Sequence, residues 1–196
     1  MGLNLLRKGD LYNMWIFLGI VAVLVLLAVS MYNGLVRKRN YIREAWSSID
    51  VQLKLKTNVL TNLVDTIKMQ TKYESETLEK IVGLRRQMLS SDKGEAMKAN
   101  DAITRMIPSL YAVSESYPEL KSNQSFLKLM EDIKNIEEKI AYARTRYNKT
   151  VMEYNTAIQT FPTVIFAGMF GFTKEETYEI SEAERENADN LRIRDL

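Results

Sequence analysis

Two short stretches contain the residue pair that serine–lysine catalysis requires, a serine three positions before a lysine. They are Ser90 with Lys93 and Ser125 with Lys128. In that chemistry a desolvated lysine takes the serine proton and an oxyanion site stabilises the intermediate. The companion motifs Ser-Asp-Asn and Lys-Thr-Gly do not occur in the chain. We therefore interpret both matches as chance and expect no enzyme.

Clusters of carboxylates suggest a second chemistry, the binding of a metal ion. Helical di-metal sites combine such carboxylates with histidine, and the chain contains neither histidine nor cysteine. This absence also excludes histidine-based triads, zinc fingers and disulfides. We interpret the clusters as solvated helix faces and expect no catalytic residue, no metal and no cofactor. The clusters are Glu74, Glu76 and Glu79, and Glu131, Asp132, Glu137 and Glu138.

Within one stretch near the C-terminal end, a tyrosine followed by an asparagine recurs after seven residues, at Tyr147-Asn148 and Tyr154-Asn155. Their separation of seven residues equals two helical turns, so both pairs lie on one helix face. One interpretation is a packing seam that contains both tyrosines, and the other is a family signature. The asparagines lie at the edge of the seam, where their amides can form hydrogen-bonded ladders to a neighbouring helix.

The composition favours long helices. Among 196 residues there are three prolines and eight glycines, and the formal net charge is +2. Long stretches without either residue indicate helices rather than many short strands. A charge this small gives no general attraction to nucleic acid, so we expect no nucleic-acid partner.

An uncharged apolar segment covers residues 11–32, after a short flank at 1–10. About 20 apolar residues are enough to cross a bilayer. Trp15 and Tyr32 lie near its two ends, where aromatic rings prefer the membrane interface. Alternative interpretations are a signal peptide cleaved near Ser30 and a buried core helix. We predict a retained, single-pass transmembrane helix.

Basic residues after this segment predict its orientation. Arg37, Lys38 and Arg39 follow it, with Arg43 beyond, whereas only two basic residues precede it after the initial methionine. The positive-inside rule then places the C-terminal part in the cytoplasm. The same basic residues are suited to contact anionic lipid headgroups, so membrane lipids are an expected partner.

Apolar residues at alternating steps of four and three predict a heptad seam after the membrane segment. We expect one continuous helix to about Leu89, ended by the turn-forming stretch 90–95. A second helix follows, with a kink or restart at Pro108. The seam residues are Ile42, Trp46, Ile49, Leu53, Leu60, Leu63 and Ile67, with Lys56 in one seam position.

A third helix is expected to begin near Asn123, a favoured N-cap residue, and to end at Pro162. An apolar segment at 162–172 follows, which is too short to span a membrane. It either caps the core, lies in the membrane interface or packs on another subunit. The tail at 173–196 is charged and is interpreted as a solvated helix or a disordered end. The third seam is Phe126, Leu129, Ile133, Ile136, Ile140, Ala143, Tyr147, Val151, Tyr154, Ile158 and Phe161.

Several pieces in fixed order resemble the LemA family of bacterial membrane proteins. They are YNGLVRKRNYIREAWSSIDVQLK, NLV, YPELKSNQSFLKL, EEKIAYARTRYNKTVMEYN, FP and GMFGF, which together cover most of Tyr32 to Phe172. The resemblance implies an N-terminal anchor and a long antiparallel helical domain, with no agreed biochemical activity. Thr61 stands where the family pattern usually has a proline, which favours a straighter first helix.

Together these features predict an all-α chain in which a transmembrane helix continues into a coiled-coil-like helical bundle at 33–161. We expect a structural or interaction protein of a bacterial cell membrane that self-associates as a homo-oligomer. The alternative is a membrane-coupled signalling module. The residues expected to pack or to assemble the protein are Trp46, Tyr147, Tyr154, Phe161, Phe166 and Phe170.

Overall fold

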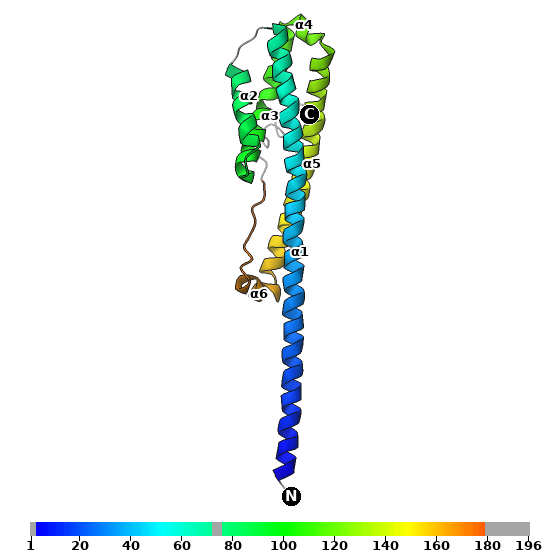
Figure 1. The fold of residues 1–196 in the computed structure, drawn as a ribbon, viewed down its shortest axis with the longest axis vertical. Helices are drawn as coiled ribbons and strands as arrows, with labels where there is room; N and C mark the ends of the chain where they lie inside the picture. The colour runs from blue at the N-terminus through cyan, green and yellow to red at the C-terminus, as the bar shows by residue number, and fades with distance from the viewer. Residues whose placement is uncertain (1–2, 72–75, 179–196) are drawn as a thin grey trace, which may run out of the picture. The chain divides into compact units, whose positions relative to one another are not determined.

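A computed structural model describes residues 3–71 and 76–178 of the chain (Figure 1). All regular elements in these ranges are helices, which confirms the predicted all-α class. The helices are α1 (Leu3–Thr71), α2 (Glu76–Met88), α3 (Lys93–Ser116), α4 (Pro118–Lys121), α5 (Gln124–Gln159) and α6 (Thr163–Met169). Glu74 and the tail beyond residue 178 lie outside the described ranges.

The chain divides into two compact units. The described residues of 44–147 form one, here called the bundle unit, and the described residues of 1–43 and 148–196 form the other, the terminal unit. Helices α1 and α5 contribute residues to both units.

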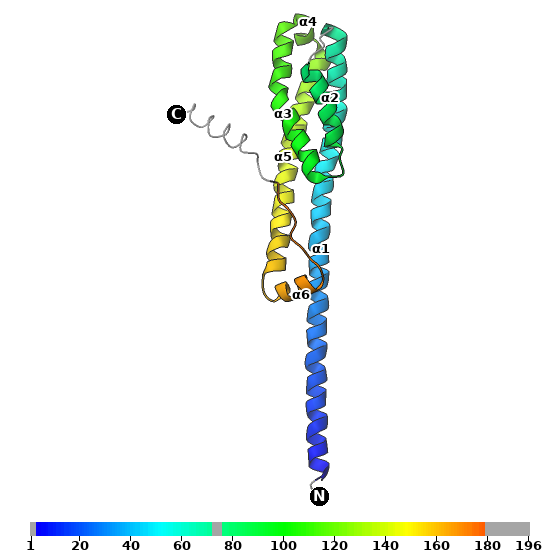
Figure 2. The same ribbon diagram turned by 90° about the vertical axis from the view of Figure 1, so that its left-hand side faces the viewer.

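The bundle unit is an antiparallel arrangement of helices. Its part of α1, then α2, α3 and its part of α5 run in alternating directions, as Figures 1 and 2 show. Each helix turns an apolar stripe inward, and burying one such side chain contributes about 1.5–3 kcal/mol. The shared core contains Leu60, Leu63, Val64, Ile67, Leu78, Ile81, Met88, Ala99, Ile103, Leu110, Leu120, Phe126, Met130 and Ile133.

The first helix ends earlier than the sequence suggests. We expected it to reach about Leu89, but α1 ends at Thr71 and a separate helix α2 begins at Glu76. The seam stops at Ile67, and Met69 is 83% exposed. Because Leu78 and Ile81 join the same core as Ile67, a reversal buries apolar surface that a straight rod would leave in water.

A kink or a restart is predicted at Pro108, and the helix does not restart there, since α3 continues through this residue. Two predicted helix starts have local caps. Asp92 Oδ1 accepts a hydrogen bond from the Glu95 amide at the start of α3. Asn123 Oδ1 accepts one from the Phe126 amide, as expected for the N-cap of α5.

In the terminal unit, α1 carries the apolar segment, and α6 lies beside α1 in both views (Figures 1 and 2). One helix in the described part of the chain is long and apolar enough to cross a membrane, and none of its most apolar window is buried. Residues 173–178 are not helical. They form an extended strap along α5, whereas we expected this part to be a solvated helix or disordered.

Candidate functional site

A lysine lies inside the bundle unit. Lys56 occupies a seam position of α1, and its side chain is 0% exposed. Its Nζ lies 2.5 Å from Glu137 Oε1 on α5 and donates hydrogen bonds to Asn100 Oδ1 (2.7 Å) and Thr104 Oγ1 (3.0 Å) on α3. Thr104 donates in turn to Glu137 at 2.6 Å. One charged network therefore joins three helices and supplies the partners that a buried charge requires.

Burial lowers the pKa of Lys56 below its ordinary value of 10.5, and the Glu137 carboxylate offsets this only in part. Lysines with a lowered pKa serve as bases or nucleophiles in some enzymes. In this chain the ammonium is enclosed by its three partners, so a substrate cannot reach it. The arrangement holds helices together, and it offers no site for a reaction.

The two serine–lysine pairs are not arranged for catalysis. Ser90 Oγ donates to Glu95 Oε2 at 2.5 Å rather than to a lysine. Lys93 Nζ lies 5.7 Å from the ring centroid of Trp46 and 5.5 Å from that of Tyr147, which is cation–π geometry. Ser125 and Lys128 are both exposed. Neither pair has the desolvated lysine that the chemistry needs.

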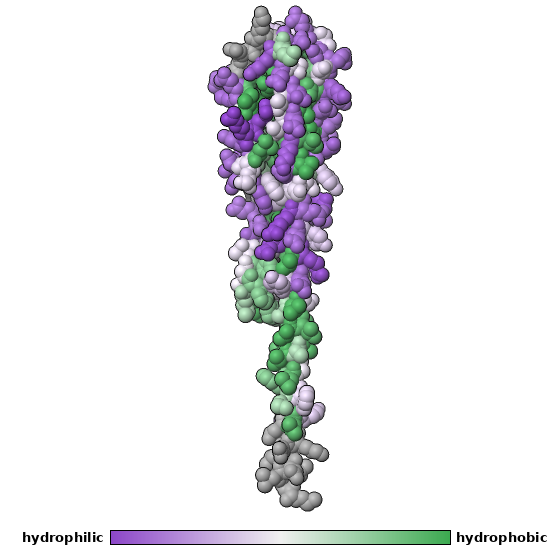
Figure 3. Space-filling model, in the orientation of Figure 1, coloured by the Kyte–Doolittle hydropathy of each residue, from purple (hydrophilic) through white to green (hydrophobic). Residues whose placement is uncertain are grey.

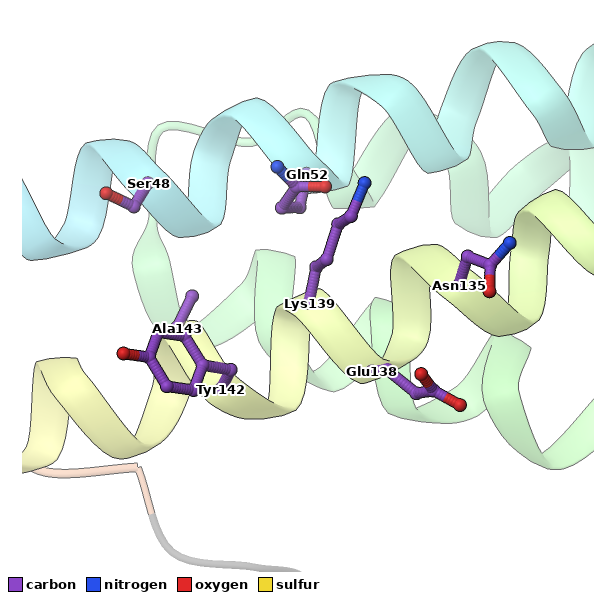
Figure 4. A pocket seen from close by; sticks show the side chains of 7 residues that line it. All are labelled: Ser48, Gln52, Asn135, Glu138, Lys139, Tyr142 and Ala143. Carbon is purple, nitrogen blue, oxygen red and sulfur yellow. The ribbon is translucent and has the colours of Figure 1, made fainter.

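A surface groove of about 510 Å³ lies between α1 and α5 in the bundle unit. Figure 4 shows Lys139 extending from α5 toward Gln52 on α1, while Glu138 points away from α1. The remaining lining residues are Ser48, Asn135, Tyr142 and Ala143. The groove contains no paired acid and base, and the described residues hold no group of three or more acidic side chains that could bind a metal ion.

Aromatic contacts in the terminal unit join the end of the apolar segment to the α6 region. The Tyr32 ring meets the Phe170 ring edge-on at 5.1 Å between centroids and the Phe172 ring at 5.7 Å. The Arg39 guanidinium lies 5.2 Å above the Phe172 ring. We call Tyr32, Arg39, Phe170 and Phe172 the Tyr32 cluster. Such contacts add about 0.5–1.5 kcal/mol each beyond the burial of area.

A glycine-based turn makes this cluster possible. Gly171 has φ of +70°, a left-handed conformation that glycine adopts without steric cost. The Phe172 amide donates to Ala167 O and the Gly171 amide to Gly168 O, the two bonds of a Schellman C-cap. The chain therefore reverses after α6, and Phe172 becomes buried at 7% exposure.

The two asparagines of the repeated pair hold the strap. Asn155 donates to Glu175 O at 2.8 Å and accepts from the Glu175 amide at 3.0 Å. Asn148 makes the same two bonds with Tyr178, at 2.6 Å and 2.8 Å. We call this the asparagine clamp. The ladder expected with a neighbouring helix is therefore made with an extended segment instead.

Tyr154 supports the same strap. Its hydroxyl donates to Thr173 O at 2.9 Å, and its ring is 1% exposed. Burial, with the Glu175 carboxylate adding to it and Arg39 opposing it, raises the pKa of Tyr154. The phenol therefore stays a neutral donor at physiological pH.

The structure separates the residues predicted for the membrane interface. Trp15 is 68% exposed within the apolar segment, and Tyr32 and Arg39 meet in the Tyr32 cluster. Arg37 is exposed, and Lys38 is half-buried.

The residues predicted for packing and assembly lie in four different places. Trp46 and Tyr147 meet edge-on at 6.0 Å in the bundle unit, and Phe166 stacks with Phe170 at 6.5 Å in the terminal unit. Tyr154 holds the strap. Phe161 does not continue the seam: it is 81% exposed, because α5 ends at Gln159 before the turn at Pro162.

The seam pattern places Lys56 among the core residues but does not indicate its partners. Asn100 and Thr104 carry no local signal of this role, and Glu137 was assigned to a solvated face. A lysine in an otherwise apolar seam is the one indication of a buried polar network, because such a residue needs a charged partner across the core.

One family model and two relatives match the chain. The model of the LemA family matches residues 45–190. The chain is 27% identical over 180 residues to Protein LemA of Metamycoplasma hominis, covering 91% of this chain and 82% of that protein. It is also 27% identical over 104 residues to the magnetosome protein MamQ of Magnetospirillum gryphiswaldense, covering 53% of this chain and 38% of MamQ. The match to the family model covers well over half of the chain, which therefore belongs to the LemA family.

Proposed function

We propose that this chain is a membrane-anchored structural or interaction protein without catalytic activity. The observation that carries the proposal is the uncovered apolar face of α1. Side chains from Leu11 to Leu27 are exposed all round the helix, including Phe17 at 65% and Leu26 at 69%. A helix that is apolar on every side and not covered by protein fits a lipid surrounding.

The lengths agree with one crossing. Residues 11–32 in α-helical geometry extend about 33 Å, and the hydrocarbon core of a bilayer is about 30 Å thick. We place the crossing in a bacterial cell membrane, with residues 33–196 in the cytoplasm. The basic residues Arg37, Lys38 and Arg39 at one end support this orientation.

Alkaline extraction tests the anchoring. The full chain should remain with membranes and dissolve only in detergent. Replacing Leu18 and Val25 with arginine should release it, because each charge at the centre of a span costs about 2.5–3.5 kcal/mol on insertion scales. The matched control places arginine at Lys121 and Lys128, which are exposed in the bundle unit. Release of the unmodified chain by carbonate would contradict the proposal.

Single-cysteine labelling tests the orientation, since the chain has no native cysteine. Lys121→Cys should resist a membrane-impermeant thiol reagent in intact cells and react after lysis. Asn4→Cys, on the other side of the span, should react in intact cells. The reverse pattern would place the bundle unit outside.

We further propose that copies associate. Val51 and Leu55 are one helical turn apart on α1 and remain 49% and 45% exposed in the bundle unit. Apolar pairs of this kind suit a contact between subunits, and confinement to a membrane raises their effective concentration. Light scattering in mild detergent should give a mass above one chain, and a Val51→Glu, Leu55→Lys variant should reduce it.

The second candidate is a membrane-coupled signalling module. The observation in its favour is that α1 runs without a break from Leu3 to Thr71, so one element belongs to the apolar segment and to the bundle core. Inserting two glycines after Gly34 distinguishes the candidates. A signalling module would no longer transmit a signal along α1 into the bundle unit. An anchored structural protein would keep its membrane association and the mass of its assembly.

A further inference from the structure

We propose that α6 and the residues beside it enter the lipid interface at the Tyr32 end of the apolar segment, as a second membrane contact of the chain. This inference rests on the proposed membrane anchoring. Its partner is the boundary between headgroups and acyl chains of a bilayer that contains anionic lipid.

The α6 region is apolar and turned outward. No charged residue occurs from Phe161 to Phe172. In this stretch only Ala167 and Phe172 are buried. An exposed apolar group of this density marks a contact surface. The exposed members are Phe161 (81%), Val164 (44%), Ile165 (54%), Met169 (76%) and Phe170 (46%).

The Tyr32 cluster fixes the depth of this surface. Phe170 lies 5.1 Å and Phe172 5.7 Å from the Tyr32 ring, so α6 is held at the last residue of the apolar segment. With one crossing by residues 11–32, Tyr32 reaches the interface, where aromatic side chains are preferred. A segment bound to Tyr32 lies at the same depth. Figure 3 shows the hydrophobic surface of α1 continuing onto the α6 region.

Positive charge adjoins the apolar surface on one side. Arg37 and Arg39 follow Tyr32 by five and seven residues, about 8–11 Å farther along the helix. Arg39 is tied to the α6 region through the Phe172 ring. This places cationic side chains at the level of lipid phosphates, where each basic residue near an anionic surface contributes about 1 kcal/mol. Apolar groups bordered by basic ones are typical of interfacial helices.

A second copy of the chain fits this surface less well. The association of copies is proposed above through Val51 and Leu55 of the bundle unit, so a second copy has its contact on another part of the chain. The surface is also continuous with the apolar segment, which already faces lipid in the proposed arrangement. Lipid is therefore the partner of this surface.

Quenching by spin-labelled lipids tests the proposal in the full chain. Ile165→Cys and, separately, Met169→Cys carry an environment-sensitive fluorophore in vesicles of phosphatidylcholine and phosphatidylglycerol. Both side chains point outward, so the label does not replace a core residue. A nitroxide near the headgroup end of the acyl chain should remove most of the emission, and one near the methyl end should remove less. Aqueous iodide should have little effect.

Two matched positions make the outcomes distinct. Val23→Cys, in the middle of the apolar segment, should be quenched most by the deep nitroxide, and Lys128→Cys, in the bundle unit, only by iodide. If Val23 is quenched but Ile165 and Met169 respond only to iodide, the α6 inference is overturned and the anchoring stands. If Val23 also responds only to iodide, both are overturned. Protection of Ile165 and Met169 from both quenchers would assign α6 to a protein interface and overturn the lipid assignment.

Discussion

The two units use the same two helices but hold them with different chemistry. The bundle unit has an apolar core and a charged network between the buried Lys56 and the partly exposed Glu137. In the terminal unit aromatic rings pack at Tyr32, and the side-chain amides of Asn148 and Asn155 form hydrogen bonds with main-chain groups. A charged network needs exact partners in a closed core. Aromatic and amide contacts tolerate a surface that also faces lipid or water. The same two helices are therefore held by an ion pair and its hydrogen bonds in one unit, and by aromatic contacts and side-chain amides in the other.

The largest expected effect comes from removing the aromatic part of the bundle core. Tyr147 is 1% exposed and packs edge-on against Trp46. Tyr147→Ala should cost about 3–5 kcal/mol because a large cavity remains. That loss lowers the melting temperature by roughly 6–20 °C, measured by circular dichroism in detergent. The control is Tyr142→Ala on the same helix, where the ring is 76% exposed. Equal melting of both variants would refute the buried role.

The next effect comes from breaking the charged network on one side only. Glu137→Leu leaves the Lys56 ammonium buried without its carboxylate and should cost about 3 kcal/mol. The double variant Lys56→Met, Glu137→Leu should recover most of this loss, since no charge then remains in the core. Thermal melting of Glu137→Leu, of Lys56→Met and of the double variant gives the coupling energy between the two side chains. Additive losses would show that the two side chains do not interact.

A smaller effect is expected in the terminal unit. Asn155→Ala removes two hydrogen bonds to Glu175, worth roughly 1–3 kcal/mol together. The loss should release the strap without lowering the melting temperature of the bundle unit. The release of the strap is measured as faster hydrogen exchange of the Glu175 amide. Asn155→Asp keeps the acceptor and loses the donor, so it should have an intermediate rate. An unchanged rate in Asn155→Ala would exclude the clamp.

The smallest effect concerns pH. Burial lowers the pKa of Lys56 in the folded chain, and the unfolded value is near 10.5. Between these two values the unfolded chain binds more protons, so the free energy of unfolding rises with pH. The stabilisation that comes from deprotonating Lys56 is complete above pH 10.5 and is lost as pH falls through the pKa of Lys56 in the folded chain. The difference between wild type and Lys56→Met should follow this course in denaturant melts. A difference that stays constant with pH would contradict it.

Local patterns in the sequence were sufficient for some elements. The α5 stripe from Phe126 to Ile158 follows helical periodicity, and Asn123 is a local cap, so both could be predicted. The reversal between Thr71 and Glu76 could not, because the stretch contains no proline or glycine and its cause is burial in a core formed by distant residues. The partners of Lys56 could not be predicted either, because they depend on how three helices pair. The strap could not be predicted because its charged residues are typical of a solvated tail.

The asparagine clamp has a consequence for how freely this part of the chain can change. Both asparagines bind only main-chain groups, so the side chains at 175 and 178 do not decide whether the strap binds. Proline alone is excluded there, since it lacks the amide that each asparagine oxygen accepts. Two helical turns between the asparagines, about 10.5 Å, match three steps of extended chain, about 10 Å. Side-chain substitutions at 175 and 178 should therefore have mild effects on strap binding. The loss or gain of one residue between Glu175 and Tyr178 would instead separate one of these residues from its asparagine.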